Sequence, residues 1–265
     1  MNRIEALFAN RENGEKVMSL FLTAGYPTTN DTASLVLGCE AAGADLIELG
    51  IPFSDPLADG PTIQYSSTEA IRQGITMEKI FSIVEEIRAS SDIPLVLMGY
   101  INPILSYGVS SFCKRAAEAG VDGLILPDIT LEEAALIEEE ARRNGLAQIH
   151  LVAPNTSDER MREIDRRSSG FVYCVSVTGV TGARDGDEVA RSVEKFIDRV
   201  NTHVTRNPKM VGFGIKNHED AQRIAARADG FIVGSALIET IRNTWPENGW
   251  EEELFDFVRR LKQGT

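Results

Sequence analysis

Eight short apolar runs, each followed by a segment with helical spacing, divide this 265-residue chain from end to end. Each run is too short for a helix and is bounded by Gly, Pro or polar residues, which is typical of a buried strand. The runs cover residues 17–23, 45–49, 94–98, 123–126, 148–152, 171–175, 209–213 and 230–233. Strands that alternate with helices form a parallel sheet, because each parallel neighbour is reached by a crossover connection.

A quasi-repeat recurs where helices give way to strands. Residues 42–48, 119–126 and 225–233 share one order: a helix ends in small residues, an Asp turns the chain, and a strand follows. No long linker or change in composition interrupts this order, so we expect an α/β fold, a single (β/α)₈ TIM barrel over residues 1–265. An open doubly wound sheet is the alternative. The lack of a GxGxxG motif after the first run counts against that alternative without removing it.

Helical periodicity predicts several elements outside the strands. A helix over residues 131–144 should begin with a capping box made by Thr130 and Glu133 and should end at Gly145. Further helices are expected at residues 188–200 and 217–226. An extra amphipathic helix ahead of the first strand is suggested by Ile4, Leu7 and Phe8, and a helix at the other end by Leu254, Phe257, Val258 and Leu261. We expect extra short helices as well.

The charge balance excludes several classes of partner. Lys and Arg number 27 against 40 Asp and Glu, which gives a net charge of −13. An acidic surface repels nucleic acid phosphates and anionic membranes, although a local pocket can still bind a small phosphate. The first residues lack the apolar core of a signal peptide, and no apolar run approaches membrane-spanning length. We therefore expect a cytoplasmic protein that binds neither nucleic acid nor membrane.

The cysteines and histidines show no metal-ligand spacing. The cysteines are odd in number, far apart and outside any CxxC pattern: Cys39, Cys113 and Cys174. The histidines are dispersed in the same way: His150, His203 and His218. We expect packed thiols in a reducing compartment and no metal site.

Acidic residues gather at the end of the second apolar run. Glu48 shares a strand face with Leu46, and that face should point into the barrel mouth, where burial raises a carboxyl pKa into the range for proton transfer. A structural ion pair with an Arg is the alternative. Asp59 follows in the loop after the same strand, where it could instead be a turn or N-cap residue. Asp55, before a proline, is assigned mainly to turn formation.

Glycines gather at the ends of the last strands. Glycine pairs lie in residues 179–182 and 212–215, and a single glycine lies in 233–236. In barrels the loops after strands seven and eight often cradle a phosphate at a helix N-terminus. Ser235 could add its hydroxyl. A pocket for a flat aromatic group could be formed by Phe21, Ile63, Met98, Tyr100, Leu126 and Phe213, although each also fits an ordinary core. Tyr173 could face the same mouth and donate a hydrogen bond to substrate, or it could pack in the core.

Several segments together closely resemble the tryptophan synthase alpha subunit family. They are residues 21–27, 46–61, 97–103, 176–182, 212–215 and 234–236, and the second is long and highly specific. The resemblance implies a lyase that cleaves indole-3-glycerol phosphate by retro-aldol chemistry to indole and glyceraldehyde 3-phosphate. Glu48 matches the general acid/base of the family. Asp59 matches the carboxylate that hydrogen-bonds the indole N–H.

The resemblance also implies roles for other positions. Thr181 matches a lid residue that contacts Asp59, and Tyr173 matches a position that contacts substrate. The phosphate cradle would be Gly182, Gly214, Gly234 and Ser235. The indole pocket would be lined by Phe21, Met98, Tyr100, Leu126 and Phe213.

A partner follows from the same resemblance. The alpha subunit docks on a beta subunit that carries pyridoxal phosphate, and an α₂β₂ heterotetramer is expected. The loop after the second strand and residues 102–105 would meet that partner, while this chain requires no cofactor itself. Two rival interpretations stay open: another phosphate-binding barrel enzyme, such as a sugar-phosphate isomerase or epimerase, and a barrel that serves beta as an allosteric scaffold.

Overall fold

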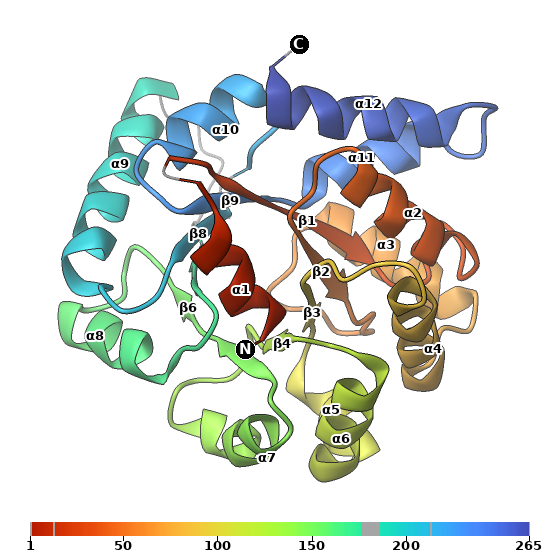
Figure 1. Cartoon of the computed structure of the whole chain (residues 1–265), viewed down its shortest axis with the longest axis horizontal. Coiled ribbons are helices and arrows are strands. Elements are labelled where there is room, and N and C mark those ends of the chain that lie inside the picture. The colour runs from red at the N-terminus through yellow and green to blue at the C-terminus, as the bar shows by residue number, and fades with distance from the viewer. Residues whose placement is uncertain (1, 13, 176–185, 213, 265) are drawn as a thin grey trace.

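Helices and parallel strands alternate along the chain in a computed structural model that describes residues 2–12, 14–175, 186–212 and 214–264 (Figure 1). The strands are β1 (Val17–Thr23), β2 (Leu46–Gly50), β3 (Leu95–Met98), β4 (Gly123–Ile125), β5 (Ala147–Ile149), β6 (Leu151–Val152), β7 (Val172–Val175), β8 (Lys209–Gly212) and β9 (Gly230–Val233). The helices are α1 (Arg3–Asn10), α2 (Asp31–Ala41), α3 (Pro61–Arg72), α4 (Met77–Arg88), α5 (Ile101–Tyr107), α6 (Val109–Ala119), the 3₁₀ helix η1 (Glu133–Leu136), α7 (Glu138–Arg143), α8 (Asp158–Arg167), α9 (Gly186–His203), α10 (His218–Ala225), α11 (Ser235–Thr244) and α12 (Trp250–Gln263).

The strands form one parallel sheet that closes into a barrel. Their order is β5-β4-β3-β2-β1-β9-β8-β7-β6, so the two outermost strands in this order are β5 and β6. A single residue, His150, separates these two strands in the chain, and they pair with opposite neighbours, β4 and β7. The segment expected as one strand over 148–152 is thus one bent strand that completes the ring. The TIM barrel is confirmed and the doubly wound alternative is wrong.

Alternation along the strands separates an inner layer of side chains from an outer one. Every residue of β1 and β2 is buried, as expected for parallel strands covered on both faces. The inner cluster contains Val17, Leu46, Val96, Ile125, Ile149, Phe171, Met210 and Ile232. The outer cluster joins the strands to the surrounding helices. A close approach occurs where Gly38 of α2 meets Phe255 of α12, because a Cβ there would lie 2.0 Å from the ring.

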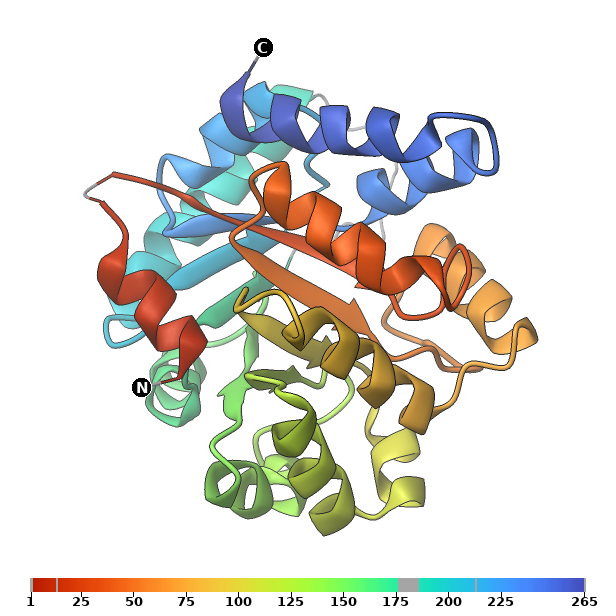
Figure 2. The same ribbon diagram turned by 45° about the vertical axis from the view of Figure 1, so that its right-hand side comes forward.

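The extra N-terminal helix covers the end of the barrel where the strands begin (Figures 1 and 2). Its Ile4 is fully buried and belongs to the inner cluster. Phe8 packs against Phe171 at the start of β7, with ring centroids 6.2 Å apart. Asn2 caps the helix by accepting a hydrogen bond from the Ile4 N–H at 2.9 Å. The expected α1 is confirmed, and its apolar face closes one end of the barrel.

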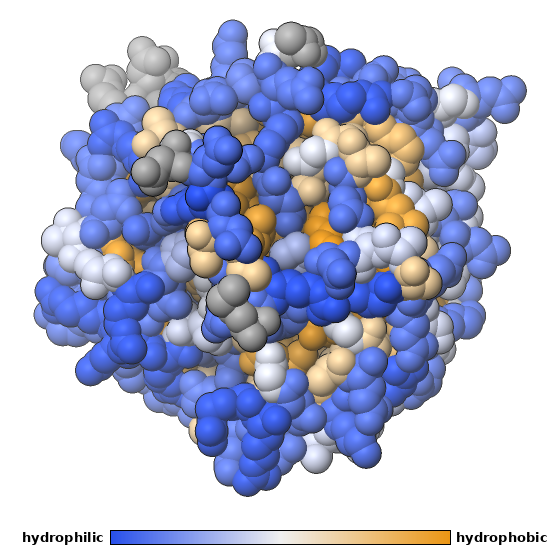
Figure 3. Space-filling model, in the orientation of Figure 1, coloured by the Kyte–Doolittle hydropathy of each residue, from blue (hydrophilic) through white to orange (hydrophobic). Residues whose placement is uncertain are grey.

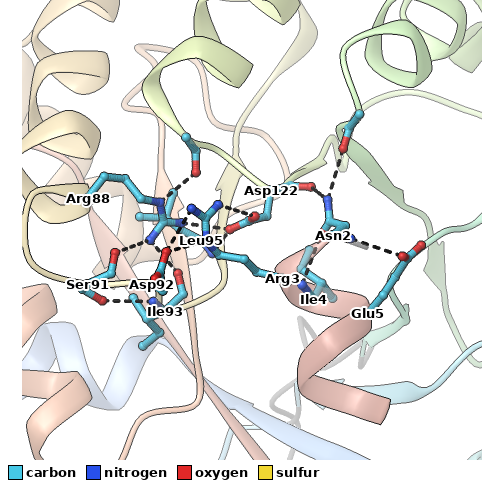
Figure 4. A network of polar contacts seen from close by, with 12 residues as sticks. Asn2, Arg3, Ile4, Glu5, Arg88, Ser91, Asp92, Ile93, Leu95 and Asp122 are labelled. Carbon is cyan, nitrogen blue, oxygen red and sulfur yellow. Dashed lines mark hydrogen bonds and ion pairs between the residues drawn. The ribbon is translucent and has the colours of Figure 1, made fainter. Parts of the chain in front are cut away.

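A polar network centred on Asp122 holds α1 against the strands (Figure 4). The buried Asp122 carboxylate accepts the Leu95 N–H at 2.9 Å and pairs with Arg88 at 2.8 Å and with Arg3 at 3.1 Å. Asn2 donates to the Asp122 carbonyl at 2.7 Å. Asp122 is the Asp of the second quasi-repeat, and its role is structural: it connects the starts of β3 and β4 with the N-terminal helix.

The helix expected over residues 131–144 is wrong as a single element. The capping box exists, since Glu133 accepts the Thr130 N–H at 3.0 Å and donates its own N–H to the Thr130 hydroxyl at 3.3 Å. The chain nevertheless forms η1 and then α7, because Ile137 between them has φ −127° and turns its side chain into the core. The expected end at Gly145 holds, with φ +72°.

Candidate active site

Glu48 is a fully buried carboxyl near the carboxyl end of β2. Parallel pairing places it beside Phe21 of β1 and Val96 of β3. The Ser19 hydroxyl donates a hydrogen bond to Glu48 Oε1 at 2.7 Å, and Oε2 has no hydrogen-bond partner among the described residues. Burial raises the pKa of Glu48 to about 8, against the opposing effect of Ser19. This side chain is therefore mostly protonated at neutral pH.

Asp59 lies in the loop between β2 and α3. Its Oδ2 accepts the Tyr100 hydroxyl at 2.9 Å, and that hydroxyl in turn accepts the Ala58 N–H at 3.0 Å. The N-cap position of α3 is Gly60, so the Asp59 side chain does not cap this helix. Burial raises the pKa of Asp59, and the hydrogen bond from Tyr100 opposes the change.

Tyr173 of β7 approaches the same region from the opposite side of the barrel. Burial raises its pKa, and the negative charges of Glu48 and Asp59 raise it further, which places the phenol near both carboxyls. Gly212 makes room for it, because a Cβ there would lie 2.9 Å from the Tyr173 hydroxyl oxygen. Three titratable groups therefore converge at the carboxyl ends of the strands, where barrel enzymes carry their active sites.

A small cavity lies beside Asp59, and neither Glu48 nor Tyr173 is among its walls. Its volume is about 10 Å³, and its walls are Phe21, Thr23, Gly50, Ile51, Pro52, Asp59, Ile63, Ser67, Met98, Gly99, Tyr100 and Pro127. A space of that size holds about one water molecule. Five of the site residues expected from sequence thus line it together: Phe21, Asp59, Ile63, Met98 and Tyr100. Leu126 does not line it and is buried in the larger apolar cluster.

Other residues of the site escaped the sequence interpretation: Ser19, which hydrogen-bonds Glu48, and the cavity walls Thr23, Ser67 and Gly50. Ser19 and Thr23 lie inside an apolar run, and each is two residues from Phe21, so strand alternation was the signal that could have placed them on its face. Ser67 of α3 accepts the Phe53 N–H at 2.9 Å and thereby ties the loop before α3 to the helix. Gly50 gives space to Phe21, since a Cβ there would lie 2.5 Å from the ring.

The glycine-rich strand ends lie next to each other on β8 and β9. Gly234 and Ser235 begin α11, whose first N–H groups point out of the helix end, as in known phosphate sites. Gly214 after β8 has φ +53°, and no atom lies within 4 Å of a Cβ built on it. Thr181, Gly182 and Phe213 lie outside the described residues.

Neither a metal-binding cluster nor a membrane-spanning helix is found in the described part of the chain. No group of three or more His, Cys, Asp or Glu side chains is arranged to hold a metal ion among the described residues. Within the same residues, no helix is long and apolar enough to cross a membrane.

Eight strand positions closed into a parallel barrel, with two carboxyls of raised pKa at the end where such barrels carry their active sites, define the TIM-barrel class of enzymes. A family model described as "Tryptophan synthase alpha chain" matches residues 8–265. The chain belongs to the tryptophan synthase alpha chain family, and it is a carbon–carbon lyase of tryptophan biosynthesis.

Individual relatives agree with the family model over the whole length. The tryptophan synthase alpha chain of Thermoanaerobacter sp. (strain X514) is 47% identical over 264 residues, 99% of each chain. That of Geotalea daltonii is 48% identical over 265 residues, 100% of this chain and 99% of its own. The crystal structure of the alpha subunit from Legionella pneumophila str. Paris superposes with a TM-score of 0.90 at 36% identity, covering 99% of this chain and 98% of that one.

Proposed function

We propose that Glu48 is the general acid/base with which this chain cleaves indole-3-glycerol phosphate. The Oε2 proton is transferred to the indole carbon that bears the glycerol chain, which makes the ring an indolenine cation. Glu48 then accepts the proton of the adjacent glycerol hydroxyl, the carbonyl forms, and the carbon–carbon bond electrons return to the ring. Indole and glyceraldehyde 3-phosphate result without any other reactant. A buried carboxyl whose pKa is raised to about 8 suits both transfers near neutral pH.

Asp59 is the proposed electrostatic partner of the indole ring. As a carboxylate it accepts the indole N–H and stabilises the positive charge that develops there. Tyr100 holds Asp59 Oδ2 at 2.9 Å, and this contact orients the carboxylate toward the cavity that it lines. Tyr173, beside both carboxyls, is proposed to contact the substrate.

Substrate entry requires the cavity to widen. The present space holds about one water molecule, whereas an indole ring is several times larger. Ile51, Pro52 and Asp59 belong to the loop between β2 and α3, so movement of this loop can open the wall. Phe21, Ile63, Met98, Tyr100 and Phe213 remain the proposed indole contacts, with Leu126 behind them.

The phosphate is assigned to the other side of the mouth. Gly214, Gly234 and Ser235 supply backbone N–H groups and a hydroxyl near the start of α11, and a helix N-terminus favours a bound anion. Gly182 and Thr181 are proposed to complete the cradle and the lid.

The family acts with a beta subunit, and we propose an α₂β₂ assembly for this chain. Leu57, in the loop after β2, is 95% exposed, and Leu105 of α5 is 45% exposed. Exposed apolar side chains near the active-site mouth suit a protein interface. The pyridoxal phosphate is assigned to the beta subunit and no cofactor to this chain, and the complex is placed in the cytoplasm.

The unpartnered Oε2 of the fully buried Glu48 is the observation that carries this proposal. The test incubates purified protein with indole-3-glycerol phosphate and measures released indole. Glu48→Gln should lower kcat at least about 100-fold while substrate still binds, because an amide cannot shuttle a proton. The control, Glu86→Gln on the exposed face of α4, should keep normal turnover.

Three other results would contradict the proposal. Near-normal turnover in Glu48→Gln would remove Glu48 from its role. If the protein does not cleave indole-3-glycerol phosphate but turns over sugar phosphates in a substrate panel, the isomerase alternative is favoured. Absence of turnover both with and without beta would favour the scaffold alternative.

A further inference from the structure

Ser19 is a polar side chain buried in the middle of an apolar strand. It is fully buried in β1, opposite Leu46 in the pairing with β2 and two residues before Phe21. Burying a hydroxyl costs free energy unless it is hydrogen-bonded, so a serine at a core position calls for a stated partner. That partner is Glu48 Oε1, at 2.7 Å.

We propose that Ser19 is a positioning residue for Glu48, which locks the carboxyl so that Oε1 is held and Oε2 alone exchanges protons with the substrate. The inference rests on the proposed acid/base role of Glu48. Ser19 itself touches no substrate in this scheme and acts through the carboxyl.

The geometry distinguishes the two carboxyl oxygens. An oxygen that accepts a hydrogen bond from Ser19 behaves as the carbonyl-like partner, and the proton of the neutral acid then lies on the other oxygen. That other oxygen, Oε2, is buried and has no hydrogen-bond partner among the described residues. Without Ser19 the carboxyl could rotate, and either oxygen could carry the proton.

No described residue other than Ser19 hydrogen-bonds the Glu48 carboxyl. Its neighbours in register are Phe21 on β1 and Val96 on β3, which cannot hydrogen-bond a carboxyl through their side chains. The titratable group that interacts electrostatically with it is Tyr173 from β7, and Asp59 from the loop after β2 interacts with the same Tyr173. Within the described residues no Lys or Arg influences its pKa, so Ser19 is the one group that stabilises the carboxylate.

Ser19 also lowers the pKa of Glu48 against the effect of burial. Glu48 must be protonated to begin the reaction, so activity falls as pH rises through its pKa. Loss of the hydrogen bond removes a contact that favours the carboxylate, which raises this pKa further. The alkaline limb of the kcat profile should then move to higher pH.

The test compares three variants of the full chain. Ser19→Ala should lower kcat about tenfold, because a misoriented acid loses the effective concentration of a fixed one. KM should change less than twofold, and the alkaline limb of the kcat profile should shift upward. Ser19→Thr keeps a hydroxyl and should restore both kcat and the limb. Ser91→Ala, a buried serine bonded to the Ile93 N–H at 3.0 Å at the far end of the barrel, is the matched control.

Ser91→Ala should lower the melting temperature as Ser19→Ala does and leave the pH profile unchanged. The proposal is overturned if Ser19→Ala shows the wild-type limb, if only its melting temperature falls, or if Ser19→Thr rescues nothing. If Ser19→Ala fails to fold, Ser19→Cys replaces it, because a thiol fills the same space and is only a weak hydrogen-bond donor. An alkaline limb of the kcat profile at the wild-type pH in Ser19→Cys would overturn the proposal equally. Glu48→Gln separates the two levels: if it stays active the acid/base role itself fails, whereas an inactive Glu48→Gln beside a normal Ser19→Ala rejects only the role of Ser19.

Discussion

Glu48 should make the stability of this protein depend on pH in a direction opposite to that of a salt-bridged carboxylate. Its pKa is about 8 in the folded protein against 4.5 for the free side chain. Between these values the unfolded chain has lost the proton and the folded chain keeps it, so stability falls as pH rises. Each pKa unit corresponds to about 1.4 kcal/mol, so the shift of about 3.5 units costs about 5 kcal/mol above pH 8 and about 3 kcal/mol at pH 7.

Glu48→Gln removes this dependence because an amide does not titrate. The amide oxygen can still accept the Ser19 hydroxyl, but the amide hydrogens would be buried without acceptors, at a cost of about 1–3 kcal/mol at every pH. We therefore expect the variant to be less stable than wild type at pH 5 and more stable at pH 8. The difference in unfolding free energy between the two should change by about 4 kcal/mol over that interval.

Urea unfolding followed by far-UV circular dichroism at pH 5, 6, 7 and 8 measures that difference directly. Glu86→Gln on the exposed face of α4 controls for the loss of one negative charge from the whole molecule, and its difference from wild type should stay constant. A difference between Glu48→Gln and wild type that varies by less than about 0.5 kcal/mol from pH 5 to 8 would refute the argument that burial holds this carboxyl neutral.

Two further predictions concern stability and assembly. Asp122→Ala should lower the unfolding free energy measured in urea by about 3–5 kcal/mol, because it leaves the buried Arg88 guanidinium without its carboxylate partner. The Asp92 side chain is 91% exposed, so Asp92→Ala should lower it by less than about 1 kcal/mol. Equal losses in the two variants would contradict this. Leu57→Ser should weaken binding of the beta subunit about tenfold or more in titration calorimetry, while Leu136→Ser, exposed on η1, leaves it unchanged; the reverse pattern would move the interface elsewhere.

The barrel was predictable because its signals are local. Strand-length apolar runs, helical spacing and the Asp at three of the helix-to-strand junctions each involve residues close together in the sequence. The break of the fifth strand at His150 was not predictable from local signals, because it depends on that strand pairing with β4 before the break and with β7 after it. The split between η1 and α7 depends likewise on the core accepting Ile137.

The site was predictable in part for a similar reason. Glu48 stood out as a charge in a buried strand, which is costly unless it has a use. Ser19 carried no such signal, because a neutral hydroxyl in an apolar run is unremarkable until the register with β2 is known. Leu126 follows the last residue of β4 and is not among the cavity walls, so its contact with indole stays a prediction.

Among the described residues, the N-terminal helix closes the end of the barrel opposite the candidate active site. Ile4 is fully buried beneath the barrel, and Leu46, directly below Glu48 on β2, is fully buried as well, so no path crosses the described part of the interior from that end. Indole-3-glycerol phosphate, glyceraldehyde 3-phosphate and indole must all pass through the rim formed by the loops after the strands. A protein seated on that rim would regulate arrival and departure at the same time.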